Sequence, residues 1–343
     1  MSAPRRTRAC RWSAALVIAW AALPVLLGGC DGNSAAGQSP ATAATLPPPI
    51  PADRRSGCPA SAPAVHDWVI APEVDDAEKA LPALRIASTA PSITEVCCAL
   101  GLRACLVGRS RYCTYPPGIE QVPSLGALVD IDVERLHALK PDLVLVAGRS
   151  QAIRDKLDAL QLKYVSIGDE SLADIYNGIR RIGQLTGRVR TAERLCRGIQ
   201  ADVEAVAQRY AGGPKRRVLL LVGVLADPPR PPTVAGPGSF YDDLLRRVGQ
   251  ENVAPPGHVP FGALSLEYIV RVDPEVVIEL DPDGRARPEG DADALRVWRK
   301  LGPLQAVAAR RVHVIPGPQH YLPGPRIAET FEQLSRAIAG RQP

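Results

Sequence analysis

The sequence predicts an α/β protein of two lobes, each with a mainly parallel central sheet flanked by helices, joined by one long helix. Three observations support this prediction. Strand-like and helix-like segments alternate along most of the chain, one segment of about 22 residues keeps helical periodicity without proline, and one stretch occurs twice. With 343 residues, the chain is long enough to form two hydrophobic cores.

The repeated stretch is DVERLHALKPDLVLV, residues 132–146, and its second copy is SLEYIVRVDPEVVIEL, residues 265–280. Each copy begins with a helix-capping side chain and has a glutamate two positions later, Glu134 in the first copy and Glu267 in the second. Apolar residues follow at helical spacing, then a proline, then an aliphatic run. This pattern predicts a short capped helix, a proline stop and a buried strand, with the two glutamates at equivalent points of the two lobes.

The formal net charge of +5 arises mostly at the N-terminus, where residues 1–29 contain four arginines and no acidic residue. The rest of the chain contains 37 basic and 36 acidic residues and has no basic run. A chain with this charge balance lacks the positive surface that nucleic-acid binding requires. We therefore expect no nucleic-acid partner.

Residues 1–29 have the features of a signal peptide, because an arginine-rich start precedes an apolar segment that is too short for a comfortable membrane span. They lead into Cys30 through Leu-Gly-Gly, which resembles the lipobox of bacterial lipoproteins, where the peptide is cut before the cysteine and the cysteine carries lipid. Lipid on Cys30 would hold the protein on the periplasmic face of the inner membrane or on the cell surface. Residues 30–80 are rich in proline and alanine and are expected to form a tether.

The N-terminal lobe is expected over residues 81–188. Ser92 and Glu95 have the spacing of a capping box and predict the start of its first helix, which ends at Gly101. The other predicted elements of this lobe, apart from the repeated unit, are strands at 85–88, 106–108 and 164–167, a loop at 109–118, and helices at 151–160 and 172–185.

The interlobe helix is expected over residues 189–212, because apolar side chains recur there at steps of three or four. A helix of this length spans about 30 Å, which is enough to cross between two lobes. The C-terminal lobe is expected over residues 213–343. Apart from the repeated unit, its predicted elements are strands at 217–222 and 312–315, loops at 226–238 and 316–324, and helices at 240–248 (capped by Ser239), 291–301 and 325–339.

The usual enzyme signatures are absent from the sequence: there is no nucleophile elbow, no P-loop, no zinc-protease motif and no dinucleotide fingerprint. The five histidines are scattered, so we expect no catalytic residue and no metal site. Cys113 lies in a predicted loop without an identifiable base beside it, which favours an inert thiol. Spacing does not give the disulfide pairing of the six cysteines after residue 30, which are Cys58, Cys97, Cys98, Cys105, Cys113 and Cys196.

Several runs resemble the substrate-binding proteins of ABC importers for vitamin B12 and ferric siderophores. These runs are RIASTAPSITEVCCALGL, VGRSRYCTYPPG and DVERLHALKPDLVLV, followed in family order by GPGSFYDDLL, SLEYI and PGPRIAE. The resemblance covers residues 85–339. It implies a ligand cleft between the lobes, modest hinge motion, and reversible binding of a transported ligand without catalysis or a permanently bound cofactor.

The resemblance also implies that Glu134 and Glu267 dock onto arginines of an ABC permease, which works with its ATPase. Carboxylate–guanidinium pairs suit this role because they can be bidentate and so orient the partner. From the residues alone, both acids could instead complement a helix N-terminus.

Four aromatic residues are the candidate ligand contacts. Tyr112 matches the aromatic that lines the cleft of the B12 binders, Tyr115 is its neighbour, Phe261 stands where those binders place a tryptophan, and Tyr321 lies on the last loop. Flat aromatic side chains favour a large planar ligand. Tyr115 could instead pack on the next proline, and Phe261 could lie in the core. The sequence departs from the B12 binders in having Leu125 and Ala147 where they have further tryptophans.

We therefore expect a lipid-anchored solute-binding protein that captures a bulky metal chelate, with cobalamin or a related corrinoid favoured, and delivers it to an ABC permease. An alternative is a ferric siderophore or haem binder. The arginines that could then pair with an anionic chelate are Arg109, Arg111, Arg149 and Arg326. An alternative of another class is an extracytoplasmic sensor or scaffold domain.

Overall fold

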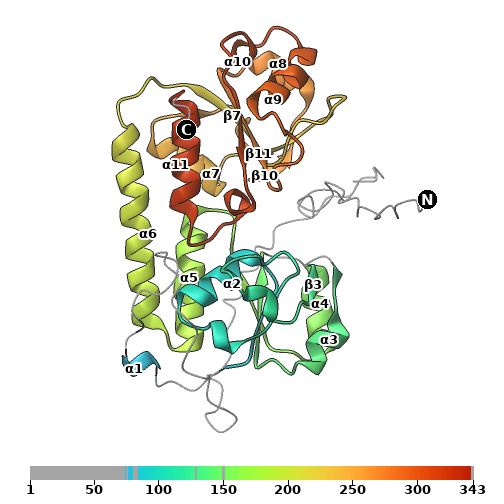
Figure 1. The fold of residues 1–343 in the computed structure, drawn as a ribbon, viewed down its shortest axis with the longest axis vertical. Coiled ribbons are helices and arrows are strands. Elements are labelled where there is room, and N and C mark those ends of the chain that lie inside the picture. The colour runs from blue at the N-terminus through green and yellow to red at the C-terminus, as the bar shows by residue number, and fades with distance from the viewer. Residues whose placement is uncertain (1–73, 75, 80–83, 128–129, 149–150, 341–343) are drawn as a thin grey trace, which may run out of the picture.

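The structure is a computed structural model, and it describes residues 74, 76–79, 84–127, 130–148 and 151–340. It has the predicted two lobes, which are joined by the helix α6 (Val189–Tyr210) along one side of the molecule (Figure 1). The predictions for Cys30, the signal peptide and most of the tether fall outside the described residues. No helix in the described ranges is long and apolar enough to cross a membrane.

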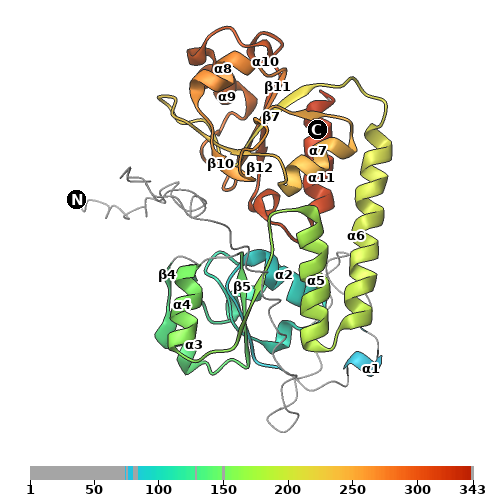
Figure 2. The same cartoon turned by 180° about the vertical axis from the view of Figure 1, so that it is seen from behind.

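The N-terminal lobe is built on a sheet of four parallel strands in the order β2-β1-β5-β6. Helices α2 and α5 cover the face toward α6, and α3 and α4 cover the other face (Figures 1 and 2). The elements of this part of the chain are α1 (Asp76–Lys79), β1 (Ile86–Ser88), α2 (Pro91–Ala99), β2 (Leu106–Gly108), β3 (Gly126–Ala127), β4 (Asp130–Ile131), α3 (Val133–Ala138), β5 (Leu143–Ala147), α4 (Gln151–Ala159), β6 (Tyr164–Ile167) and α5 (Leu172–Thr186).

The C-terminal lobe has a six-stranded sheet in the order β10-β8-β7-β11-β12, with β9 paired to β7. β8 runs in the direction opposite to the other five strands of this sheet, so the sheet is also mainly parallel. Its elements are β7 (Arg217–Leu221), β8 (Thr233–Ala235), α7 (Phe240–Arg247), β9 (Glu251–Asn252), β10 (Phe261–Ala263), α8 (Leu266–Val272), β11 (Val276–Asp281), α9 (Asp291–Trp298), α10 (Gln305–Ala308), β12 (Val312–Pro316), the 3-10 helix η5 (Pro318–Tyr321) and α11 (Ile327–Ile338).

The two sheets share one internal register, which confirms that the repeated stretch marks a structural repeat. In the N-terminal lobe, Ile86 of β1 is the partner of Leu143 of β5. In the C-terminal lobe, Val218 of β7 is the partner of Val276 of β11. Residues separated by 132 or 133 positions in the chain therefore occupy equivalent places in the two sheets.

The hydrophobic core explains why the lobes are distinct but firmly connected. The sheet faces toward α6 belong to one continuous cluster of buried side chains that runs through α5, α6 and α11. The opposite face of each sheet has a separate cluster of its own, around Leu136 and Leu157 in one lobe and around Trp298 in the other. Burial along α6 thus fixes one side of the molecule, while the other sides of the lobes pack independently.

The start of α2 differs from the prediction. The capping residue is Ala90, which makes no side-chain cap, and Pro91 takes the first helical position. Proline suits that position because its φ angle is already helical and its missing amide would have had no partner there. The predicted capping box of Ser92 and Glu95 is therefore wrong, and Glu95 is left for another role.

Candidate functional site

Glu134 and Glu267 occupy equivalent positions on two short helices. Each is the second residue of its helix, and each helix is capped by the predicted side chain: Asp132 accepts from the amide of Arg135 at 2.8 Å, and Ser265 accepts from the amide of Tyr268 at 3.2 Å. Both glutamates are exposed and have no hydrogen-bond or ion-pair partner among the described residues. The two carboxylates are therefore free to meet a partner.

The far end of each of these helices is held by an arginine that the sequence reading missed. In the N-terminal lobe, Arg85 donates to the carbonyls of Leu139 and Lys140, at 2.8 and 3.3 Å, and its amide donates to Asp142. These contacts satisfy carbonyls that the end of a helix leaves without a partner.

Arg217 makes the same set of contacts in the C-terminal lobe. It donates to the carbonyls of Val272 and Asp273, and its amide donates to Glu275 at 3.0 Å. In both lobes the residue before the proline is left-handed, with φ of 44° at Lys140 and 47° at Asp273. The repeat thus extends to an arginine at the start of the first strand, which ties each glutamate-bearing helix to its sheet.

Tyr112 and Tyr115 lie half-buried on the loop that follows β2. The loop is closed by Arg109, whose buried guanidinium donates to the carbonyls of Ile119, Ser110 and Glu120 at 3.0 to 3.1 Å. Arg109 therefore holds the loop in shape, because each of its three guanidinium nitrogens donates to a backbone carbonyl.

Arg326, which precedes α11 in the C-terminal lobe, reaches across to the N-terminal lobe. Its guanidinium lies over the ring of Tyr115 at 4.2 Å and forms a two-point pair with Glu95 of α2. The structure thus brings Tyr115 to the boundary between the lobes, where a guanidinium from the opposite lobe covers one face of its ring.

Phe261 and Tyr321 are half-buried in the C-terminal lobe. Phe261 packs near Phe240 and Tyr241, with ring centroids 5.9 and 6.2 Å away. The hydroxyl of Tyr321 donates to the carbonyl of Leu280 at 2.5 Å, and burial raises the pKa of this phenol well above its usual value. Both rings pack against the cluster of buried side chains that runs through α5, α6 and α11, and Tyr115 packs against the same cluster.

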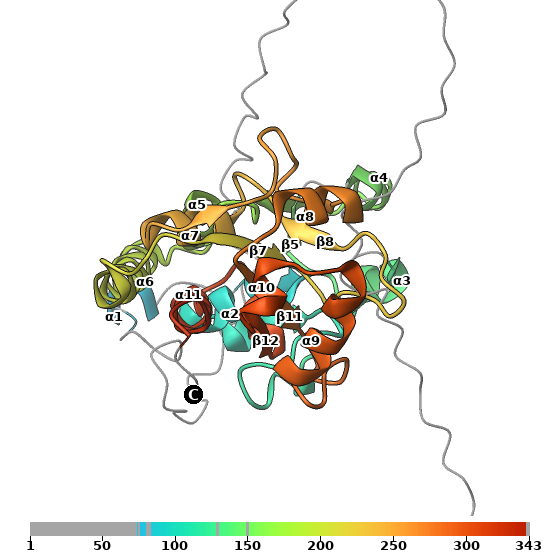
Figure 3. The ribbon, with the colours of Figure 1, turned by 90° about the horizontal axis from the view of Figure 1, so that it is seen from above.

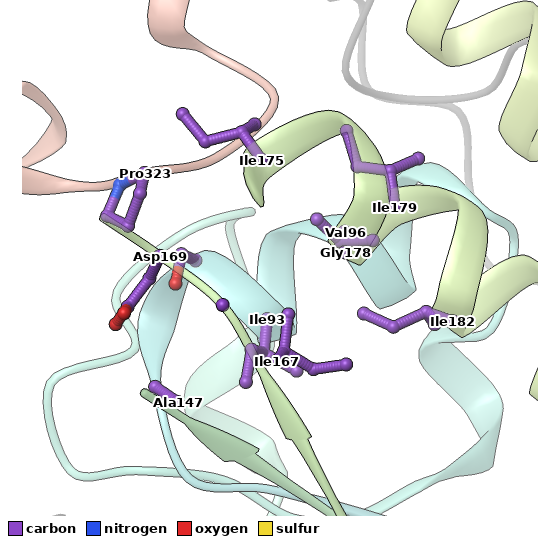
Figure 4. A pocket seen from close by; sticks show the side chains of 12 residues that line it. Ile93, Val96, Ala147, Ile167, Asp169, Ile175, Gly178, Ile179, Ile182 and Pro323 are labelled. Atoms are coloured by element: carbon purple, nitrogen blue, oxygen red, sulfur yellow. The ribbon is translucent and has the colours of Figure 1, made fainter. Parts of the chain in front are cut away.

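A small apolar hollow, with a volume of about 10 Å³, lies beside this boundary, and no sequence pattern indicates it. Figure 4 shows side chains of α2 and α5 pointing into it, with Pro323 of the C-terminal lobe and Asp169 at one end. Its apolar side chains include Ile93, Val96, Ile167, Ile175, Ile179 and Ile182. The hollow has about the size of one water molecule.

The cysteines and histidines do not form a reactive centre in the described residues. Cys113 is buried, Thr94 lies 3.2 Å from its sulfur, and burial raises the pKa of its thiol to about 11, which fits the predicted inert role. Within the described ranges, His, Cys, Asp and Glu side chains do not gather in groups of three or more that could hold a metal ion.

A family model for periplasmic binding proteins matches residues 86–318. Among curated proteins, a vitamin B12-binding protein of Salmonella typhimurium is 27% identical over 196 residues, which are 57% of this chain and 71% of that protein. An ABC transporter substrate-binding lipoprotein of Bacillus subtilis, YvrC, is 27% identical over 262 residues, which are 74% of this chain and 79% of that protein.

Solved structures show the same fold. The periplasmic haem-binding protein RhuT of Roseiflexus, in its apo form, is 26% identical with a TM-score of 0.63, and the match covers 76% of this chain and 99% of RhuT. The vitamin B12-binding protein BtuF of Vibrio cholerae is 23% identical with a TM-score of 0.64, over 76% of this chain and 99% of BtuF. The chain therefore belongs to the periplasmic binding protein family, whose members are binding proteins for transport and not enzymes.

Proposed function

We propose that this protein captures a bulky planar metal chelate between its lobes and delivers it to an ABC permease with its ATPase. The observation that carries the proposal is the pair of free glutamates at equivalent places on two rigidly held helices. Both copies of the repeat have the glutamate, the side chain that caps its helix and the arginine that holds the end of that helix. This agreement favours one kind of contact for both surfaces. Guanidinium groups on a permease are the natural partners of such carboxylates.

The placement of the two helices supports docking. Both α3 and α8 lie away from α6, one in each lobe (Figure 1). Viewed along the long axis, α6 is at one edge of the molecule and α3 is at the opposite edge (Figure 3). A permease that met Glu134 and Glu267 together would therefore meet the sides of the lobes that pack independently.

The favoured ligand is cobalamin or a related corrinoid, with Tyr112, Tyr115, Phe261 and Tyr321 as proposed contacts. Aromatic rings suit a large ligand with a flat face. The B12-binding relatives point the same way. We also propose that lipid on Cys30 anchors the protein to the outer face of the membrane. The substrate-binding lipoprotein among the relatives supports this anchor.

Haem is the second candidate ligand, because haem-binding proteins are among the structural relatives at 26% identity. A strongly anionic ferric siderophore fits less well. Of the four arginines that could serve it, Arg109 and Arg326 are already engaged, Arg111 is exposed near Asp130, and Arg149 lies outside the described residues.

Equilibrium dialysis of the full-length protein in detergent against cyanocobalamin and haemin tests the ligand. We expect saturable binding of the corrinoid, weakened at least tenfold by Tyr112→Ala. Silence toward every corrinoid would overturn the corrinoid assignment and leave the fold untouched.

Uptake by proteoliposomes that contain the permease and ATPase tests the docking. Changing Glu134 and Glu267 to alanine together should abolish delivery while ligand affinity is retained. Asp202→Ala is the matched control, because Asp202 is an exposed acid on α6, away from α3 and α8. A large loss of affinity in the double variant would mean that the glutamates support the ligand site instead. If ligand binding and uptake are absent while a sensor partner is engaged, the sensor or scaffold class replaces transport.

A further inference from the structure

One ion pair crosses between the lobes at the proposed ligand site. Arg326 donates from Nε to Oε2 of Glu95 at 3.0 Å and from Nη2 to Oε1 at 2.5 Å. Glu95 is 2% exposed, and the side chain of Arg326 is 14% exposed. Because the carboxylate of Glu95 binds the guanidinium of Arg326 at two points, its negative charge offsets the positive charge of the guanidinium.

The compensated guanidinium forms the surface that a ligand on Tyr115 would meet. It lies 4.2 Å from the centre of the Tyr115 ring, so the ring, the guanidinium and the carboxylate lie in contact. Burial raises the pKa of Glu95, and the hydrogen bond and charge of Arg326 oppose that rise. The two side chains therefore depend on each other for their charged forms.

The other two arginines of this loop keep the same charge when Glu95 or Arg326 is replaced. Arg109 has its three nitrogens on backbone carbonyls. Arg111 is exposed and lies 3.7 Å from Asp130, where solvent screens it. The charge that a ligand meets at Tyr115 therefore depends on whether Glu95 compensates Arg326.

We propose that Glu95 is a specificity-determining residue: by neutralising Arg326, it makes the site select electrically neutral chelates over anionic ones. The inference rests on the proposed function and narrows its ligand class. Cyanocobalamin is neutral overall, because the charge of its cobalt(III) is balanced by the corrin, the cyanide and the phosphate together, whereas ferric catecholates and haem carry net negative charge. Removing the carboxylate while leaving the guanidinium would place a full positive charge against Tyr115, in surroundings where charge acts strongly.

The test compares two probes, cyanocobalamin and the ferric tris-catecholate complex, by equilibrium dialysis of the full-length protein in detergent. In Glu95→Gln, the affinity ratio of the anionic probe to the neutral probe should rise about tenfold, as expected for one uncompensated charge. The double variant Glu95→Gln/Arg326→Gln removes both charges and should return the ratio to the wild-type value. Arg326→Gln alone removes the partner that keeps Glu95 charged, so the buried carboxyl takes up a proton and the ratio should stay near the wild-type value.

Glu279→Gln is the matched control, because Glu279 forms another buried two-point pair, with Arg287 inside the C-terminal lobe. It should leave the ratio unchanged. If Glu95→Gln leaves the ratio unchanged, or if Glu279→Gln raises it equally, the proposal is overturned. The outcome is separable from the corrinoid assignment. Should wild-type protein ignore cyanocobalamin, a gain of ferric tris-catecholate binding in folded Glu95→Gln would still support the charge role, and its absence would refute it.

Discussion

The N-terminal and C-terminal lobes share a frame but differ in what they place around it. Three parallel strands, an arginine clamp, a capped helix and an exposed glutamate recur in the same register. The loops that follow the strands do not recur: one lobe has the Arg109 loop with two tyrosines, and the other has the β8 and β10 strands with Phe261. The comparison teaches that the proposed docking surface was kept in duplicate while the proposed ligand surface was free to diverge.

The sharpest difference inside the shared frame is at one strand position. Val146 of β5 and Glu279 of β11 are 133 residues apart and equivalent in the register. Val146 packs in an apolar cluster, whereas Glu279, fully buried, accepts from Arg287, from the indole of Trp298 and from the amide of Leu225. At this position the N-terminal lobe therefore has an apolar valine, and the C-terminal lobe has a buried glutamate with a network of hydrogen bonds.

The largest expected effect on stability comes from replacing Glu279 by an apolar residue, since the N-terminal lobe has the apolar Val146 at this position. Glu279→Leu leaves Arg287 buried without its carboxylate, so the free energy of unfolding should fall by about 3–5 kcal/mol. Urea unfolding followed by circular dichroism measures this fall. The double variant Glu279→Leu/Arg287→Leu should recover most of the loss, because it removes the unpaired charge as well. If the single variant is as stable as wild type, the network is not what holds this face of the lobe.

A second difference concerns buried histidine. His320, in η5 of the C-terminal lobe, is 4% exposed, and burial together with nearby Arg326 lowers its pKa to about 4. The unfolded chain takes up this proton near pH 6.5, so the contribution of neutral His320 is complete above that pH and is lost as pH falls toward 4. The loss amounts to about 3 kcal/mol.

Urea titrations at a series of pH values check this expectation. His320→Gln should lose less stability than wild type between pH 6.5 and 4. In the described part of the N-terminal lobe the one histidine is His137, which is exposed on α3, and His137→Gln should follow the wild-type curve. Identical pH profiles for all three proteins would contradict the role given to His320.

The two ends of α6 provide a third comparison, because each is held by a carboxylate from another helix. At its start, Glu78 of α1 accepts from the amide of Arg190 and from the amide and hydroxyl of Thr191. At its end, Glu332 of α11 accepts from Arg209 and from the hydroxyl of Tyr210. The first carboxylate completes the backbone of the helix, and the second binds only side chains.

Glu78→Ala should therefore lower the free energy of unfolding by about 1–2 kcal/mol at pH 7, as for other lost helix caps. Glu332→Ala should lower it by less. Burial disfavours the charged form of Glu78, but the bonds from Thr191 and Arg190 outweigh it and keep the pKa below the usual 4.5. The stabilisation is thus present above pH 4.5 and is lost as pH falls through the lower folded value. Unfolding at pH 7 and pH 3 measures both effects, and an equal deficit at both values would argue against a charged cap.

The sequence predicted correctly those helices and caps that depend on residues close together in the chain. The helix expected at 189–212 is found at Val189–Tyr210, and the caps at Asp132, Ser239 and Ser265 all form, because spacing and capping chemistry act within a few residues. The short strands β8, β9 and β10 were missed. Two or three residues in proline- and glycine-rich segments carry no periodicity, and only pairing with a neighbour makes them strands.

The candidate site was predictable only where it rests on the repeat or on a resemblance. The free glutamates follow from the repeated motif. The Glu95–Arg326 pair joins residues 231 positions apart, and Glu78 meets Thr191 from 113 positions away, so neither contact has a sequence signature. The sequence predicts a local capping box for Glu95, because its spacing from Ser92 fits that motif. No sequence pattern indicates that Glu95 pairs with Arg326 instead.

The smallest expected effect tests whether the two proposed docking helices are equivalent. Asp132→Ala and Ser265→Ala each remove one side-chain acceptor from the start of a helix, at 2.8 and 3.2 Å in the intact protein. Each change should lower the free energy of unfolding by about 1 kcal/mol, because one amide loses its partner. Both changes should also weaken delivery more than ligand binding, since they loosen only the helix that carries Glu134 or Glu267. Parallel urea titrations and uptake assays compare the two. Equal losses would confirm that the lobes present matched surfaces, whereas a delivery loss confined to one variant would show that a single lobe carries the contact.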